Sequence, residues 1–232
     1  MECFVGTSGW LYPWNEDGTL DWYIAHSGLN AIELNASFYR FPFPNQVKGW
    51  ASKGSTLTWV VKVNRLITHV HMLNKKAEEL YSRFLEILKP LDSRVAFYLF
   101  QFPPHFTTNM KERLLSFARK FDEKKMAFEF RNSTWYSFDF SELDFEGAIV
   151  TPDSPEISEE VWTKNSTIYL RFHGRESWYA YNYSAKELEE MARRALALEP
   201  KRLFAFFNNN HDMLGNARSF LRILSQVGPC KK

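Results

Sequence analysis

Residues 168–175, with the sequence IYLRFHGR, place basic side chains at the end of a strand-like run. Arg171 and His173 alternate with the apolar residues Leu170 and Phe172, and alternate positions of a strand share one face. An arginine can bind a phosphate or a carboxylate through two parallel hydrogen bonds. A histidine can donate or accept a proton near neutral pH. The segment therefore predicts anion binding, with His173 as a proton donor or acceptor.

Other strand-like runs also carry polar residues on one face near their C-terminal ends: Glu33 and Asn35, Lys62 and Asn64, Gln101, Glu129 and Arg131, Asp153, and Asn208. In a parallel barrel, these ends meet at the face on which barrel enzymes build their sites. Arg171 would lie deepest, in a salt bridge with Glu33 or Glu129. We expect His173, one pleat nearer the mouth, to be partly open to the pocket. Arg175 lies past the strand and is expected to be the most mobile of the three.

We assign candidate roles from this arrangement. His173 would transfer protons, Glu129 would orient or activate water, and Asp153 is the third catalytic candidate. Aromatic residues near the mouth could stack on a base or a sugar. The ligand-binding candidates are Glu33, Asn35, Lys62, Gln101, Arg131, Trp135, Arg171, Arg175, Tyr181 and Asn208.

Several alternatives stay open. Glu33, Lys62, Glu129 and Arg171 could form a self-neutralising polar layer, because buried charges must be paired. Glu33 and Glu129 could instead be a glycosidase-like carboxylate pair. The mouth could also capture a ligand without catalysis. A metal site built from His69 and the strand-end carboxylates is disfavoured because each carboxylate has an arginine or lysine competing for it, so no metal and no cofactor are expected.

The elements that position these residues are predicted to be alternating strands and helices. Strand-like runs lie at 4–8, 31–35, 58–64, 95–102, 126–131, 147–153, 167–173 and 203–209. Helix-like segments lie at 75–89, 109–121, 184–198 and 211–226. Alternating strands and helices predict parallel βα units, and eight of them fit a closed (β/α)₈ TIM barrel. We expect one domain over residues 1–232. A doubly wound sheet is the alternative, but its Gly-rich phosphate turn is missing.

Composition limits the classes of partner. Of 232 residues, 45% are apolar and 24% are charged, and the formal net charge of +2 gives no general case for nucleic-acid or membrane binding. Any anion site must be local. Its ligand would be a small-molecule anion, such as a nucleotide, or a single-stranded nucleic acid. Without an N-terminal apolar segment of the signal-peptide type, we expect a cytoplasmic protein.

Cys3 and Cys230 are too few for a disulfide framework. In a closed barrel, however, the last helix lies beside the first strand, which would bring the two cysteines together. A disulfide there would tie the two termini, although disulfides are rare in the cytosol outside hyperthermophiles. The sequence leaves this bond open.

Motifs spread over the chain resemble one known family: GTSGWLYPW, IELNASFYRFP, ITH, QFPP, EFRNSTW, TPD, RFHGR, YAYNYS and FNNN, in this order. The sequence is similar to the YecE-like proteins, domain-of-unknown-function family seventy-two. The resemblance implies a TIM barrel like those of the xylose-isomerase and endonuclease-IV superfamily, and no established activity. The segment after Trp14 is shorter here than in the family pattern, which leaves the first βα loop open.

Overall fold

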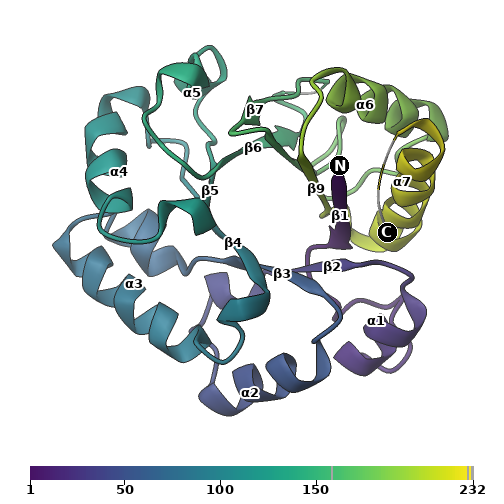
Figure 1. Cartoon of the computed structure of the whole chain (residues 1–232), viewed down its shortest axis with the longest axis horizontal. Helices are drawn as coiled ribbons and strands as arrows, with labels where there is room; N and C mark the ends of the chain where they lie inside the picture. The colour runs from purple at the N-terminus through teal and green to yellow at the C-terminus, as the bar shows by residue number, and fades with distance from the viewer. Residues whose placement is uncertain (158, 229, 231–232) are drawn as a thin grey trace. The chain divides into compact units, whose positions relative to one another are not determined.

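A computed structural model describes residues 1–157, 159–228 and 230. Within them, hydrogen bonds join the parallel strands in the order β6-β5-β4-β3-β2-β1-β9-β8, and β6 also pairs with β8. The sheet therefore closes on itself as the predicted (β/α)₈ barrel (Figure 1). The strands are β1 (Glu2–Thr7), β2 (Ala31–Leu34), β3 (Thr58–Lys62), β4 (Val95–Gln101), β5 (Met126–Glu129), β6 (Ala148–Asp153), β8 (Thr167–Phe172) and β9 (Arg202–Phe207).

Helices connect these strands. They are α1 (Leu20–His26), α2 (Pro44–Lys53), α3 (Lys75–Leu88), α4 (Lys111–Ala118), α5 (Ser133–Tyr136), α6 (Ala185–Ala197) and α7 (Met213–Val227). Shorter turns are η1 (Ala36–Phe38), η2 (Leu66–Val70), η3 (Asp92–Arg94), η4 (Thr108–Met110), η5 (Glu123–Lys125), η6 (Phe140–Glu142) and η7 (Asn210–Asp212). A membrane span would need a longer and more apolar helix than any in the described residues.

Some elements were not predicted. The short strand β7 (Thr163–Lys164) pairs antiparallel with β8, and two residues leave no readable period. Helix α1 begins after Thr19, whose side chain accepts a hydrogen bond from the Trp22 backbone, and α2 begins with Pro44. Both are ordinary helix-start signals. The third helix that was not predicted, α5, has only four residues.

The chain divides into two compact units. The first unit is Met1–Glu33, Thr56–Thr58 and Val150–Lys232, and the second unit is Leu34–Ser55 and Trp59–Ile149. Each unit has its own packing between strands and helices.

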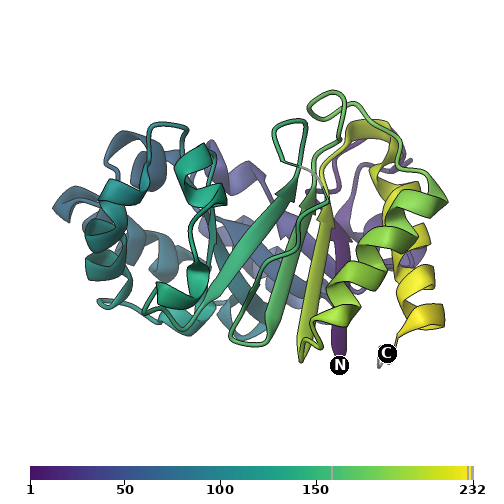
Figure 2. The ribbon, with the colours of Figure 1, turned by 90° about the horizontal axis from the view of Figure 1, so that it is seen from above.

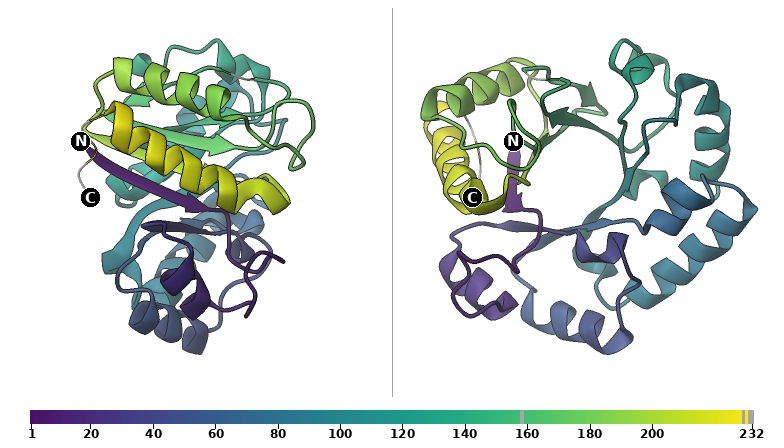
Figure 3. Two further views of the ribbon diagram at one scale, coloured as in Figure 1. Left: turned by 90° about the vertical axis from the view of Figure 1, so that its right-hand side faces the viewer. Right: turned by 180° about the vertical axis from the view of Figure 1, so that it is seen from behind.

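In the first unit, α6 and α7 pack against each other, and α7 lies beside β1 and β9 (Figure 3). The predicted capping box opens α6, since Ser184 accepts from the Glu187 backbone and the Glu187 side chain accepts from the Ser184 backbone. The Phe172 ring of β8 stacks on Phe207 with centroids 4.3 Å apart and contacts Phe220 of α7 at 5.2 Å. Phe172 thus faces the helices, and Arg171 at the preceding position faces the opposite side.

The first unit also contains both ends of the chain. Figure 2 shows the start of β1 close to the end of α7. A disulfide joins Cys3 to Cys230, with Cα atoms 5.6 Å apart. The structure thus contains the bond that the sequence left open, and it ties the two termini.

In the second unit, a cluster of aromatic rings packs the strands on the helices. Phe100 of β4 contacts Tyr81 of α3 at 5.0 Å and Phe117 of α4 at 5.7 Å between ring centroids. Phe128 is in register with Phe100, so both face the helices. Gln101 and Glu129, one position later, therefore point to the side away from the helices.

Register extends this assignment to β3. Lys62 is paired with Leu99, and Leu99 with Ala127. These residues lie two positions from Gln101 and Glu129 and share their side of the strands. The predicted orientation of Lys62 and Glu129, away from the helices, is confirmed. Arg171 in the first unit also points away from the helices, as predicted.

Gly147, just before β6, offers a test of this packing. A Cβ there would collide with the Met126 carbonyl oxygen and lie 2.5 Å from that of Glu123. Backbone atoms cannot step aside, so Gly147→Ala should lower the free energy of unfolding by about 3 kcal/mol in urea titrations. A methyl group at Gly49 in α2 would meet no atom within 4 Å, and Gly49→Ala should raise that free energy by about 0.5–1 kcal/mol. Equal effects of the two changes would contradict the packing.

Candidate functional site

The predicted site residues fall into both units. Those in the first unit are Glu33, Asp153, Arg171, His173, Arg175, Tyr181 and Asn208. Those in the second unit are Asn35, Lys62, Gln101, Glu129, Arg131 and Trp135.

The deepest feature of the first unit is a buried ion pair between Arg171 and Glu33. Arg171 Nε lies 2.9 Å from Glu33 Oε2, and Nη2 lies 2.5 Å from Oε1. Ser8 Oγ donates to Oε1 at 2.6 Å and Tyr169 Oη donates to Oε2 at 2.8 Å. Both charged residues are completely buried. The predicted salt-bridge anchor is confirmed, and Glu33 has four donors around its carboxylate, which favours a structural role for this pair.

His173 is completely buried, so the expectation that it opens to a pocket is wrong. Its Nδ1 lies 3.3 Å from Asn208 Nδ2, and the rings of Trp178 and Tyr179 contact its imidazole at 5.4 and 5.7 Å. Gly174 has a φ of +101°, a conformation that suits glycine. The chain turns there, and the Tyr179 backbone donates to the His173 carbonyl at 2.7 Å. Gly174 therefore does not leave His173 unshielded; it permits the turn that covers it.

Arg175 is held by carboxylates. Its Nε lies 3.0 Å from Asp153 Oδ2, and its Nη1 lies 3.4 Å from both Glu159 Oε1 and Glu187 Oε1. We expected Arg175 to be the most mobile of the three basic residues. In the structure, however, three acidic side chains surround it. These acids compete with any external anion for the guanidinium, and Asp153 is itself buried.

Tyr181 belongs to the same network. Its hydroxyl donates to Glu187 Oε1 at 2.5 Å, and this hydrogen bond raises the pKa of Tyr181 to about 12. Tyr181 and Asn208 are half-buried, at the edge of the network.

The second unit contains another ion pair, between Arg131 and Glu129. Glu129 is completely buried, and the Arg131 side chain is 8% exposed. The Lys62 ammonium lies over the Phe38 ring, 4.3 Å from its centroid. Asn35 and Gln101 are half-buried at the ends of β2 and β4. Glu129 therefore fixes the position of Arg131 near these strand ends.

Trp135 is not a ligand contact. It is completely buried, stacks on Phe130 at 3.9 Å and donates its Nε1–H to the Phe106 carbonyl at 2.8 Å. A tryptophan with a satisfied N–H in an aromatic stack is a core residue. The prediction for Trp135 is corrected accordingly.

His69 is the residue that the sequence reasoning missed. From the sequence it is considered only as a metal ligand, although it lies in the ITH motif. It follows β3 in η2, a single π-helical turn, and such turns are frequent at functional sites. The imidazole is half-buried, its Nδ1 lies 2.8 Å from Thr68 Oγ1, and it meets the Phe38 ring edge-on at 5.1 Å.

Local hydrogen bonds fix the segment that carries His69. Asn64 Oδ1 accepts from the Leu66 backbone at 3.0 Å, and Asn64 Nδ2 donates to the Ser37 carbonyl at 2.9 Å. Ser37 Oγ donates to the Lys62 carbonyl at 2.6 Å. The segments that follow β2 and β3 are thereby tied to each other.

The charged groups that shift the pKa of His69 are all basic. Burial first, and then the nearby basic groups of Lys62, His105, Arg65 and Arg131, lower the pKa of His69 to about 4. We call these five residues the His69 cluster. A neutral imidazole among basic side chains suits an anionic ligand. Arg65 and His105 carried no signal in the sequence, because both lie in loops. Among the described residues, no group of three His, Cys, Asp or Glu could hold a metal ion.

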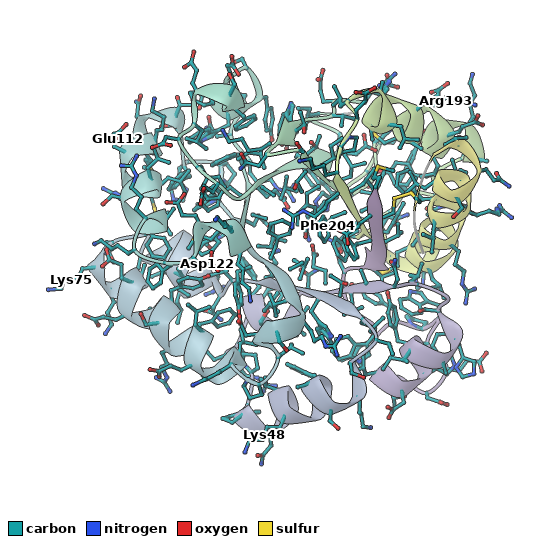
Figure 4. All side chains as sticks on the ribbon, in the orientation of Figure 1. Lys48, Lys75, Glu112, Asp122, Arg193 and Phe204 are labelled. Atoms are coloured by element: carbon teal, nitrogen blue, oxygen red, sulfur yellow. A yellow bond between two sulfur atoms is a disulfide. The ribbon has the colours of Figure 1, made fainter. Side chains whose placement is uncertain are left out.

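Breaking the buried pair should cost far more than breaking an exposed one. Arg171→Ala leaves the Glu33 carboxylate buried without its arginine and should lower the free energy of unfolding by about 3–5 kcal/mol. Arg193, which extends outward from α6 and pairs with Glu189, is the matched control (Figure 4). Arg193→Ala should cost less than about 0.5 kcal/mol. Similar urea midpoints for the two variants would refute a structural role for Arg171.

The titration of His69 checks the electrostatics. Its pKa should be about 4 in the folded protein, against an ordinary value near 6.5. Since the folded state disfavours the proton, the contribution of His69 to stability is present above pH 6.5 and is lost as the pH falls toward 4. NMR of the imidazole ring would measure this, with His69→Gln to assign the signal. A midpoint near 6.5 would contradict the cluster.

Comparisons with known proteins agree with the fold. The family model described as protein of unknown function DUF72 matches residues 4–231. A DUF72 family structure from Thermotoga maritima is 26% identical, with a TM-score of 0.82, and the alignment covers 97% of this chain and 100% of that one. One from Enterococcus faecalis is 23% identical, with a TM-score of 0.81 and coverages of 97% and 98%.

A more distant structure shares the fold alone. D-psicose 3-epimerase from Clostridium cellulolyticum, solved with D-tagatose, is 13% identical, with a TM-score of 0.58 and coverages of 97% and 98%. A search of curated proteins gave no match. Because the family model spans nearly the whole sequence, the chain belongs to the DUF72 family of TIM-barrel proteins of unknown function.

Proposed function

We propose that this protein binds a small ligand with a phosphate or carboxylate group at the His69 cluster. The observation that carries the proposal is the excess of positive charge there: Lys62, Arg65, His105 and Arg131 all act on one imidazole in the same direction. Glu129 pairs with Arg131. The net charge of the whole chain is +2, so this excess is local. A bound anion would offset it.

The first unit is a poorer candidate for the anion. Arg171 is bound to Glu33, and Arg175 lies among three carboxylates. An anion there would have to displace acids that are already in place. Of the four residues in the self-neutralising alternative, Glu33 and Arg171 pair with each other in this unit.

Aromatic residues favour a nucleotide as the ligand. The Phe38 ring contacts Lys62 and His69, and Tyr39 contacts Phe38 edge-on at 5.1 Å. Tyr39 is 75% exposed, which leaves its ring accessible for stacking. A base on Tyr39 and a phosphate at the cluster would use both features. A single-stranded nucleic acid would use them in the same way.

His69 supplies a group for hydrolytic chemistry. Its Nδ1 contacts Thr68 Oγ1, and none of the described residues forms a hydrogen bond with Nε2. An anion bound nearby raises the pKa of the imidazole from its low value, because it offsets the surrounding positive charge. His69 would then accept a proton from an attacking water in the complex, which supports phosphoester hydrolysis as the reaction class.

The glycosidase-like alternative gains no support from the contacts. Glu33 and Glu129 are each buried and bound to an arginine. Such pairing holds each carboxylate against an arginine, whereas a glycosidase directs both carboxyl groups at the bond that it cleaves.

Binding of AMP and of adenosine, measured by calorimetry, tests the proposal. AMP should bind, and its affinity should fall when KCl is raised from about 50 to about 500 mM, because the phosphate contacts are screened. Adenosine should bind at least about tenfold more weakly. Arg65→Ala should weaken AMP binding by about tenfold, and Lys48→Ala, on the outer side of α2, should leave it unchanged (Figure 4).

Equal affinities for AMP and adenosine, or equal effects of the two variants, would refute an anion site at the His69 cluster. Turnover of bis(p-nitrophenyl) phosphate separates an enzyme from a binding protein. His69→Gln should abolish that turnover while AMP still binds, since a neutral amide keeps a polar group but cannot accept the proton.

A further inference from the structure

The second unit contains a cavity of about 550 Å³ away from the His69 cluster. Its walls come from the C-terminal half of α3, the turn before β4 and the turn before β5. These segments lie at the N-terminal ends of β4 and β5, whereas Gln101 and Glu129 lie at the C-terminal ends. We call this space the Tyr81 cavity. It is independent of the function proposed above.

One wall of the Tyr81 cavity is fixed by hydrogen bonds. Tyr98 Oη donates to Asp92 Oδ1 at 2.7 Å, and Lys125 Nζ donates to Asp92 Oδ2 at 2.7 Å. Lys125 Nζ also donates to the Asp92 carbonyl at 2.8 Å. Asp92 and Lys125 thus neutralise each other, and the wall is formed before any ligand arrives.

Tyr81 gives the cavity an unsatisfied polar group. The residue is 1% exposed, and its ring is held by Phe100 at 5.0 Å and Phe121 at 4.8 Å. Within the described residues, only burial and charged or polar neighbours act on its hydroxyl, and no hydrogen bond to it is found. Burial, and then Tyr98, Asp92 and Asp122, raise the pKa of Tyr81, which places the hydroxyl near the acids of the cavity. Buried hydroxyls normally have a partner, and a polar ligand atom in the cavity would supply one.

The remaining charges of the cavity are mainly negative. Glu86 and Asp122 also line it, and neither forms an ion pair within the described part of the chain. The C-terminal end of α3 adds partial negative charge from its last carbonyl groups. The cationic side chains among the described lining residues are Lys89 and Lys125. Asp92 already binds Lys125 but does not bind Lys89. The carboxylates of Glu86 and Asp122 and the negative end of α3 thus outweigh the ammonium group of Lys89. This balance of charge favours a positively charged ligand.

We propose that the Tyr81 cavity binds a small organic cation with a guanidinium or primary ammonium group. Glu86 and Asp122 would attract the charge, and the Tyr81 hydroxyl would accept a hydrogen bond from an N–H of the ligand. The rings of Tyr81 and Tyr98 suit a guanidinium, which is planar and stacks on aromatic faces.

The test uses agmatine as the probe and follows amide NMR signals of the full chain. Agmatine should give saturable shifts at residues of α3 and of the turns before β4 and β5. Butyrate, an anion of similar length, should give none. No saturable shift with agmatine, or equal shifts with butyrate, would overturn the proposal.

Two variants locate the contacts. Tyr81→Phe removes only the hydroxyl, and Glu86→Gln removes one exposed charge; each should weaken agmatine binding by at least about fivefold. Glu112→Gln on the outer side of α4 is the matched control and should bind agmatine like the unchanged protein (Figure 4). Tyr81→Phe should not lower the unfolding midpoint, because the hydroxyl has no partner to lose among the described residues. A lower midpoint, or unchanged affinity in both variants, would show that the cavity is not a cation site.

Discussion

Charged groups that are buried away from water must be paired. This constraint applies to the charged residues on the side of the strands that faces away from the helices. In the first unit, Arg171 and Glu33 meet this need with two direct hydrogen bonds, and Ser8 and Tyr169 satisfy the remaining oxygen sites. Around this pair, Arg175 repeats the solution with acidic neighbours nearer the strand ends. Both of these arginines in the first unit therefore have carboxylate partners.

The second unit departs from this balance. Glu129 pairs with Arg131, and the charged groups that lower the pKa of His69 are all basic: Lys62, His105, Arg65 and Arg131. Basic groups gathered around a half-buried imidazole disfavour its protonated form, and such perturbed groups are common at functional sites. The contrast between the two units is the physical basis for placing the ligand at the His69 cluster. The Tyr81 cavity shows a smaller imbalance of opposite sign at the other end of β4 and β5.

Much of the fold could be predicted because it rests on short-range periodicity. Alternation along β8 placed Phe172 toward the helices and Arg171 on the opposite side. The register of β4 and β5 likewise places Glu129 on the side away from the helices. Loop conformation has no such period. The turn at Gly174 that buries His173 and the stack that buries Trp135 depend on contacts between loops and strands that no local pattern encodes. His69 was missed because the basic groups that lower its pKa come from separate segments, with Lys62 at the end of β3, His105 after β4 and Arg131 after β5.

The central claim is that the His69 cluster binds an anion, and the pKa of His69 reports on it directly. The imidazole should be titrated by NMR in the absence and the presence of saturating AMP, with adenosine as the uncharged control. A bound phosphate offsets the surrounding positive charge, so AMP should raise the pKa of His69 from about 4 by roughly one unit or more, and adenosine should leave it in place. A His69 pKa that is the same with AMP, with adenosine and with neither would contradict the account.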